Sequence, residues 1–214
     1  KAECEIVAQD WDGIIPALQQ GKYDAIMAGM SITDERKKVI DFAGPYGSEP
    51  TAFATAKGSD LTKLAFDIKS ADLATIEPAE QQALDTLAKA LAGKTVGVQT
   101  STIQANFMQT LLPKVEMRTY GTLDEAGIDL VNGRLDAILG DRSAAQEIVK
   151  KEQGLTMFGP NFVRGVLGEG VGVGLRQKDQ DLKAQFNTAI AAANQDGTIA
   201  KLAEKWFGYD ISVK

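Results

Sequence analysis

The residues best placed to do chemistry lie between positions 28 and 36. A mainly apolar stretch ends in the small residues Ala28 and Gly29, where a ligand can approach the backbone closely. Ser31 and Asp34 have the spacing of a capping box, which predicts a helix that carries Arg36 in its first turns. Helix N-terminal N–H groups and arginine side chains both bind carboxylates. The segment therefore predicts a carboxylate receptor, with an ordinary capped helix and a solvated arginine as the alternative.

A similar arrangement recurs later in the chain. A predicted strand ends at Gln99 and runs into Thr100, Ser101 and Thr102, ahead of a predicted helix. Hydroxyls and free helix N–H groups at this turn can hold the other side of the same carboxylate. The alternative is a Ser/Thr N-cap that has no ligand.

Asp141 and Trp11 are candidates for binding the rest of the ligand. Asp141 ends an apolar strand, and ligands of α/β sheets bind beyond the carboxyl ends of the strands. Its carboxylate suits an α-ammonium group, or alternatively it caps the helix that begins near Ser143. Trp11 offers an aromatic face for an aliphatic or cationic side chain, with a core position as the alternative.

The composition excludes several kinds of site. The chain has no histidine and one cysteine, Cys4, so a Ser-His-Asp triad, a Cys-His site or a Cys/His zinc site cannot form. We expect no metal and no cofactor. With 23 basic and 29 acidic residues the net charge is −6, which disfavours nucleic acid as a partner. No apolar run is long enough to span a membrane.

Apolar strands alternate with helical patterns, which predicts an α/β fold with largely parallel sheets. Asp12 as an N-cap, Pro16 in the first turn and Gly21 at the end predict a short helix. The predicted strands are 5–8, 23–28, 95–99, 115–120, 137–141, 156–158 and 171–175. The other predicted helices are 78–91, 103–112, 182–194 and 199–206.

A faint internal repeat predicts two lobes of similar construction. At an offset of 112 residues, residues 12–26 face residues 124–138. The alternative is a single sheet with repetitive helix ends. We assign residues 1–55 to the first lobe, 56–167 to the second with an inserted segment at 59–94, and 168–214 to a return strand and C-terminal helices of the first lobe. The alternating glycines of residues 168–174 lack the Lys-Ser/Thr of a phosphate loop, and we interpret them as a strand crossing between the lobes.

Seven segments carry a family resemblance that covers nearly the whole chain apart from residues 59–94. They are residues 11–18 (WDGIIPAL), 21–26 (GKYDAI), 30–36 (MSITDER), 96–99 (VGVQ), 133–138 (GRLDAI), 196–198 (DGT) and 206–207 (WF). In combination they resemble the periplasmic solute-binding proteins of polar amino-acid ABC importers, in the branch of the lysine/arginine/ornithine, histidine and opine binders.

The resemblance implies two Rossmann-like lobes, joined by a two-strand hinge, that close on one ligand as in type II periplasmic binding proteins. It implies reversible binding of an L-amino acid or amino-acid derivative in the periplasm, without catalysis, for delivery to an ABC transporter permease. Trp11 and the net acidity favour a basic amino acid or an opine. Arg36 would hold the ligand carboxylate and Asp141 the ammonium group. The implied ligand-binding residues are Trp11, Ala28, Gly29, Met30, Ser31, Arg36, Gln99, Thr102, Ile103 and Asp141.

The chain also departs from the family pattern. Relatives carry serines at the positions of Ala28 and Gly29, and often a threonine at that of Ile103, so these hydroxyls are missing here. The family begins further upstream with a strand and a helix, from which we expect a truncated N-terminus and an incomplete first lobe. Cys4 aligns with the second cysteine of a disulfide in some relatives.

Two expectations follow from the family as a whole. The complete protein would be a monomer, with a domain swap or dimer as the alternative for a truncated chain. Some proteins of this fold are cyclohexadienyl or arogenate dehydratases, so an enzyme of that kind is the alternative function.

Overall fold

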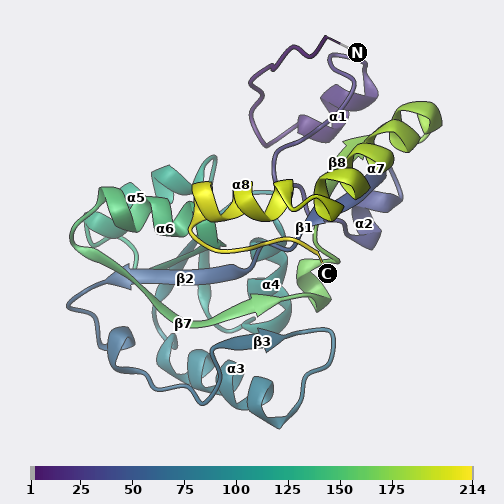
Figure 1. Ribbon diagram of the computed structural model, residues 1–214. Helices are drawn as coiled ribbons and strands as arrows, with labels where there is room; N and C mark the ends of the chain where they lie inside the picture. Colours follow the sequence, from purple (N-terminus) through teal and green to yellow (C-terminus); the bar gives the residue numbers. More distant parts are fainter. Residues whose placement is uncertain (1–2, 214) are drawn as a thin grey trace.

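Two β-sheets organise the part of the chain described by the computed structural model, residues 3–213. The larger sheet has six strands in the order β3-β7-β2-β6-β4-β5, and the smaller one pairs β1 with β8. Figure 1 shows the two sheets in different lobes, with the chain's N-terminal residues in the smaller lobe. The strands are β1 (Asp41–Gly47), β2 (Thr51–Ala56), β3 (Ser70–Asp72), β4 (Thr95–Gln99), β5 (Glu116–Tyr120), β6 (Ala137–Asp141), β7 (Leu155–Val163) and β8 (Val171–Leu175).

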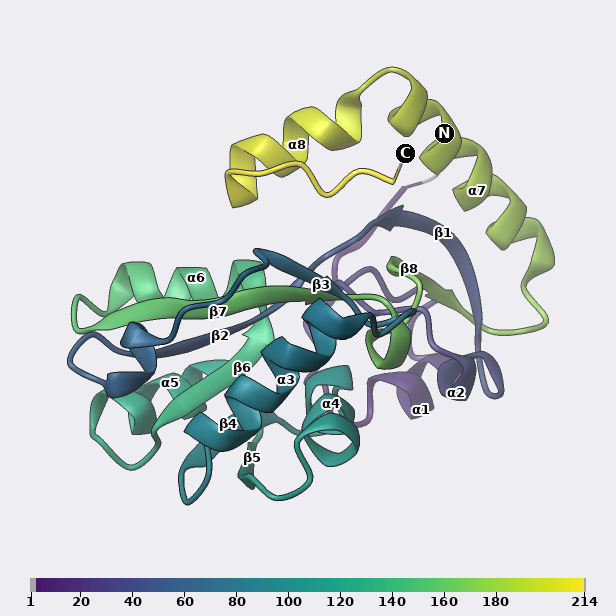
Figure 2. The same cartoon turned by 90° about the horizontal axis from the view of Figure 1, so that it is seen from below.

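The larger lobe is a sheet between two layers of helices (Figure 2). Helices α3 (Pro78–Ala90) and α4 (Ile103–Leu111) pack on one face, and α5 (Leu123–Val131) and α6 (Arg142–Lys151) on the other. Side chains alternate between the faces of a strand, so in β2 Phe53 enters the first core and Ala54 the second. The ring of Phe53 lies 5.5 Å from that of Phe158 and 6.2 Å from that of Phe107, between their centroids.

The inserted segment is part of this first core. The 3-10 helix η1 (Asp60–Lys63), β3 and α3 contribute Leu61, Ala71, Leu84 and Leu87 to it. The helix α3 begins with a proline in its first turn, which is a favoured position because the missing N–H has no helical acceptor there. Residues 59–94 therefore pack against the larger sheet.

The smaller lobe contains α1 (Ile14–Gln19), α2 (Asp34–Lys37), α7 (Gln180–Gln195) and α8 (Thr198–Phe207) around β1 and β8. Gly13, with φ of 88°, occupies the N-cap position of α1 and no side chain caps it, so the predicted Asp12 cap is wrong. Helices α7 and α8 line an apolar groove of about 760 Å³ together with Met27 and Tyr46, and the groove extends to Ser143, Ala144 and Glu147 of α6 in the larger lobe. Within residues 3–213 no helix is both long and apolar enough to cross a membrane.

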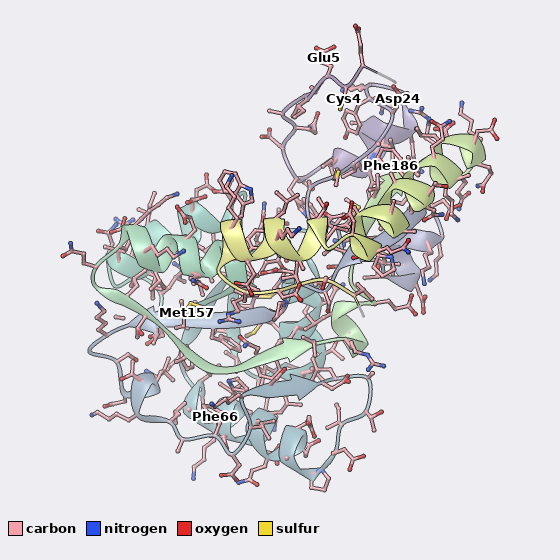
Figure 3. The ribbon with its side chains drawn as sticks, in the orientation of Figure 1. Cys4, Glu5, Asp24, Phe66, Met157 and Phe186 are labelled. Carbon is pink, nitrogen blue, oxygen red and sulfur yellow. The ribbon has the colours of Figure 1, made fainter. Side chains whose placement is uncertain are left out.

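Several predicted strands differ in the structure. Residues 5–8 form no strand, and Ile6 is 93% exposed, because no described strand lies beside them to supply hydrogen bonds. Figure 3 places Cys4 and Glu5 at the outer tip of the smaller lobe. The predicted strand 23–28 is reduced to a single bridge between Ile26 and Gly174. Strands β1, β2 and β3 were not predicted.

The sheets are also less parallel than expected. β4 runs parallel to β5 and β6, and β3 runs parallel to β7. β2 runs antiparallel to both β6 and β7, and β1 antiparallel to β8. The larger sheet is therefore mixed, because β2 and β7 reach it from the segments that connect the lobes.

The chain passes between the sheets at residues 48–50 and 164–170. At the first crossing, the Ser48 N–H donates to the Ile211 carbonyl at 2.7 Å and the Tyr209 hydroxyl donates to Glu49 Oε1 at 2.7 Å. At the second, Gly168 has a φ of 87°, and a Cβ there would lie 2.4 Å from the Ile32 carbonyl oxygen. Only glycine fits this close approach of two backbones. Gly168 precedes β8 and does not lie within it as predicted.

Candidate functional site

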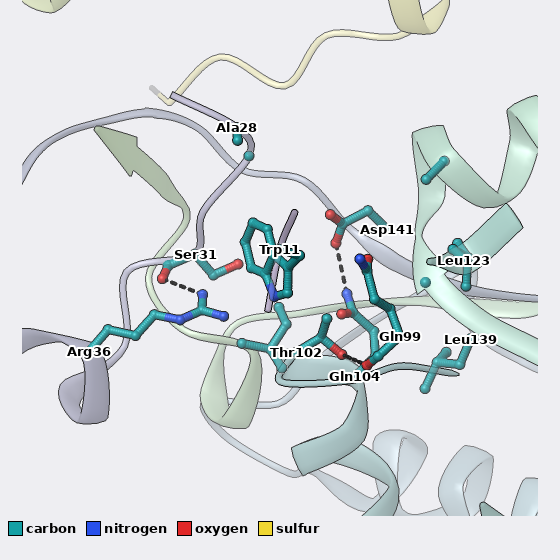
Figure 4. Close-up of a pocket in the computed structure, with 14 residues that line it drawn as sticks. Trp11, Ala28, Ser31, Arg36, Gln99, Thr102, Gln104, Leu123, Leu139 and Asp141 are labelled. Carbon is teal, nitrogen blue, oxygen red and sulfur yellow. Dashed lines mark hydrogen bonds between the residues drawn. The ribbon is translucent and has the colours of Figure 1, made fainter. Parts of the chain in front are cut away.

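The candidate site is a cavity of about 110 Å³ between the two lobes (Figure 4). Its walls come from loop and helix residues 11–36 of the smaller lobe and, in the larger lobe, from the ends of β4 and β6 and the starts of α4, α5 and α6. The smaller lobe contributes Trp11, Ala28, Gly29, Ser31 and Arg36. The larger lobe contributes Gln99, Thr102, Ile103, Gln104, Leu123, Leu139, Gly140, Asp141 and Ala144.

Arg36 is held in the wall of the smaller lobe. Its Nη1 donates to the Ser31 carbonyl at 2.9 Å, and its guanidinium lies 5.4 Å from the centroid of the Trp11 ring. Burial lowers the pKa of Arg36, and the charge of Asp141 opposes this change. An arginine guanidinium keeps its charge in proteins, so Arg36 is available to an anion.

The helix that carries Arg36 is capped differently from the prediction. Thr33 is the N-cap of α2, and its hydroxyl accepts from the Arg36 N–H at 3.2 Å. Ser31 instead forms a backbone bridge with Val171, and it is buried. The predicted capping box from Ser31 to Asp34 is therefore wrong, although Arg36 still lies in the first turn of the helix.

Thr102 begins α4 on the opposite wall. Its hydroxyl donates to the Gln99 carbonyl at 2.7 Å and accepts from the Ala105 N–H at 3.3 Å, so it is already committed. The N–H groups of the first turn, including those of Ile103 and Gln104, have no acceptor within the helix. The backbone of this turn can therefore donate to an anionic ligand, while the Thr102 hydroxyl holds the turn in place.

Asp141 ends β6 and stands at the start of α6. Its side chain does not cap the helix. Oδ1 accepts from Gln104 Nε2 at 2.7 Å, and the same nitrogen lies 2.9 Å from Thr51 Oγ1. Burial and, after it, the charge of Glu49 raise the pKa of Asp141 to about 7, against the opposing effects of Gln104 and Arg36. A cation beside Asp141 would therefore stabilise the charged form of its carboxyl group.

Glu49 supplies this second negative charge from the first crossing segment. Its Oε1 accepts from the Ser143 N–H at 2.8 Å and from the Tyr209 hydroxyl. Its Oε2 is buried and has no hydrogen-bond partner among the described residues. Sequence reasoning missed Glu49, because it lies in the connection between two strands that were themselves not predicted.

Nine of the ten residues predicted at the site line the cavity. Met30 does not: its side chain is fully buried in the core of the smaller lobe. Gly29 has a φ of 68°, and its N–H donates to the Tyr46 hydroxyl at 3.1 Å. Gln104 was missed because α4 also carries Asn106, Gln109 and Thr110, so nothing in the sequence distinguishes it from the other polar residues of the helix.

The cavity combines a cation and an anion on facing walls with apolar side chains between them. Figure 4 shows Trp11 between Arg36 and Asp141. Among the residues the structure describes, no cluster of three potential metal-ligating side chains occurs. The arrangement can bind a small zwitterion by its carboxylate and ammonium groups.

Comparison with known proteins gives a consistent result. Residues 1–209 match the family model of bacterial extracellular solute-binding proteins, family 3. The octopine-binding periplasmic protein of Rhizobium meliloti is 37% identical, over 99% of this chain and 79% of its own length. The lysine/arginine/ornithine-binding periplasmic protein of Escherichia coli is 36% identical, over 99% of this chain and 75% of its own length.

A solved structure shows the same fold. It is that of a periplasmic His/Glu/Gln/Arg/opine family-binding protein from Silicibacter pomeroyi in complex with lysine. The match has a TM-score of 0.75 and 34% identity, and it covers 99% of this chain and 82% of the other.

Proposed function

Since the chain belongs to family 3 of the bacterial extracellular solute-binding proteins, we propose that it binds an amino acid or opine reversibly between its lobes. The bound ligand is then delivered to an ABC transporter permease. One observation carries the proposal: Arg36 and Asp141 present opposite charges to one cavity from two different lobes. A zwitterion that bridges them stabilises the closed arrangement, because each end is bound by a different lobe.

Arg36 holds the ligand carboxylate together with the N–H groups of the first turn of α4. Asp141 holds the α-ammonium group, which places a cation directly beside its buried carboxylate. Hydrogen bonds to charged groups are worth roughly 1.5–3 kcal/mol each. Trp11 packs on the side chain of the ligand, and Ala28 and Gly29 leave room for it.

A basic amino acid or an opine is the proposed ligand class. Asp141 and the nearby Glu49 give the larger lobe's wall a negative character that suits a second cationic group. Two relatives point the same way, since one is named for octopine and the other for lysine, arginine and ornithine. The periplasm is the proposed location, as for these relatives, and a monomer is the proposed state.

The division of the chain into lobes is part of the proposal. Of the assignment 1–55, 56–167 and 168–214, we keep the boundary between residues 167 and 168 and move the first boundary from residue 55 to the first crossing. β2 pairs with strands of the larger sheet, so the first crossing lies ahead of it, at residues 48–50.

Isothermal titration calorimetry tests the proposal directly. The protein is titrated with arginine, lysine, ornithine, histidine, glutamine and octopine, and micromolar or tighter binding of at least one is expected. Arg36→Ala should weaken that binding at least about tenfold, or 1.4 kcal/mol. The matched control is Arg134→Ala, because Arg134 is an exposed arginine that pairs with Asp129 and does not line the cavity. Unchanged affinity in the Arg36 variant would reject the carboxylate role.

An enzymatic alternative is tested with the same preparation. Asp141 has a pKa of about 7, which is the property a general acid or base needs at neutral pH. A dehydratase would turn over prephenate or arogenate, whereas a binding protein would not. We propose that no turnover occurs, since Gln104 already donates to the Asp141 carboxylate and holds it as an acceptor for an ammonium group.

A further inference from the structure

Ser101 is a contact point between the lobes that no ligand needs to complete. It lies in the larger lobe, in the turn between β4 and α4. Its carbonyl accepts from the indole N–H of Trp11 at 3.1 Å, and its hydroxyl donates to Asp12 Oδ1 at 3.2 Å. Both partners belong to the smaller lobe, so two hydrogen bonds cross the cleft at one residue.

The turn that carries Ser101 is fixed in the larger lobe. Ser101 has a φ of 58°, in the left-handed region that residues other than glycine rarely occupy. Its neighbours hold it there: the Thr100 N–H donates to the Tyr120 carbonyl at 2.8 Å, and the Thr102 hydroxyl donates to the Gln99 carbonyl. Such a conformation persists only where the surroundings determine it. Ser101 therefore presents its carbonyl from a fixed position.

The other side of the contact is fixed in the smaller lobe. The Trp11 ring packs against the core that contains Ile14 and Leu18, and the guanidinium of Arg36 lies over the same ring. Trp11 thus faces the cavity with its ring and bonds to the larger lobe with its N–H. The ring can contact a ligand while the N–H is independent of it.

We propose that Trp11 and Asp12 form a latch that docks on Ser101 and holds the two lobes closed independently of the ligand. In a closing protein, contacts made only between the lobes add to the stability of every closed state, empty or occupied. The latch then lengthens the time for which a ligand stays bound, because opening must break it. This last consequence rests on the proposed function, whereas the effect on the empty protein does not.

The latch is tested first without any ligand. Spin labels are placed at two exposed lysines, one in each lobe, by Lys22→Cys and Lys114→Cys in a Cys4→Ser background, since Cys4 is an exposed free thiol. Double electron–electron resonance then measures the distance distribution and the ratio of closed to open protein. Trp11→Phe keeps an aromatic ring and removes the N–H, and it should lower this ratio by about fivefold.

The second tryptophan of the chain provides the control for this experiment. Trp206→Phe makes the same substitution at a tryptophan that is 68% exposed on α8, and it should leave the ratio unchanged. Asp12→Ala should act in the same direction as Trp11→Phe. The proposal is overturned if the unmodified chain shows no closed population without ligand, or if Trp11→Phe leaves the ratio unchanged. Equal thermal unfolding midpoints for the variants exclude a general loss of structure.

A second arm uses L-arginine as the probe. Stopped-flow measurements should show a dissociation rate about fivefold higher in Asp12→Ala, since Asp12 does not line the cavity, with an association rate within about twofold of the original. An unchanged dissociation rate would contradict the latch. Absence of arginine binding in every variant would count against the proposed ligand class, while the distance measurement would still decide the latch.

Discussion

Replacing Asp141 with asparagine tests how much the burial of this carboxylate lowers the free energy of unfolding. The pKa of Asp141 rises from 3.8 to about 7 through burial and the charge of Glu49. The folded chain therefore binds the proton of the Asp141 carboxyl more tightly than the unfolded chain does. Below about pH 4 the Asp141 carboxyl is protonated in both states and does not lower the free energy of unfolding. As the pH rises from about 4 to about 7 it lowers the free energy of unfolding increasingly, and above about pH 7 the effect is complete. Above that pH, the asparagine variant should be the more stable protein.

The size of the effect follows from the two pKa values. The difference between 3.8 and about 7 corresponds to roughly 4 kcal/mol of unfolding free energy, as an upper limit because water that enters the cleft screens the charge. Asparagine has the shape of the aspartate side chain, and its amide oxygen can still accept the hydrogen bond from Gln104. Urea denaturation at pH 8.5 should show the variant more stable by about 1–4 kcal/mol, and at pH 4 the two proteins should agree.

Ligand binding should change in the opposite direction. Asp141→Asn removes the charge that meets the ammonium group, so affinity for the best ligand should fall at least about tenfold at pH 8.5. Asp85→Asn is the control, because Asp85 is exposed on α3, and its stability should change by less than about 0.5 kcal/mol at either pH. A variant that is less stable than the original at pH 8.5 would refute the reasoning.

Three further changes test the surroundings of the site and the core. Glu49→Gln removes the charge that raises the pKa of Asp141, so calorimetry over a pH series should show binding persisting to lower pH. Gln104→Met removes the donor to Asp141 and should weaken binding about 3–10-fold at pH 7 but less at pH 9; equal losses at both would contradict the assignment. Phe53→Ala opens a cavity in the larger core and should cost about 3–5 kcal/mol in urea denaturation, a cost below about 1 kcal/mol counting against the packing described.

Both charged residues that the sequence predicts at the site line the cavity, and each follows a recognisable strand or helix end. Asp141 closes an apolar run, and Arg36 follows a cluster of helix-starting residues. What fails is the local detail. The cap of α2 is Thr33 and not Ser31, because Ser31 is drawn into a backbone bridge with Val171, far along the chain. Pairing with a distant strand has no signature near Ser31 itself.

The errors in the predicted strands have a related cause. β1 contains Gly44, Pro45 and Gly47, which are typical of turns, yet it pairs with β8 more than a hundred residues later. Residues 5–8 have the opposite problem, since their pattern suits a strand but no described strand lies beside them. Sheet formation depends on partners, and a single sequence shows propensity without showing the partner.

Three consecutive residues at the start of α6 connect the cavity with the first crossing segment. Asp141 faces the cavity, Arg142 stacks its guanidinium 4.2 Å from the Tyr209 ring centroid, and Ser143 bonds to Glu49 in the crossing segment. Under the proposed function, we expect a substitution that alters ligand preference here to alter the mechanics of the crossing as well. In evolution, and in the engineering of a fluorescent sensor, preference and opening speed will change together when this helix end is altered. Among the residues of the smaller lobe's wall, Ala28 has no part in the proposed latch, so we expect changes there to alter preference alone.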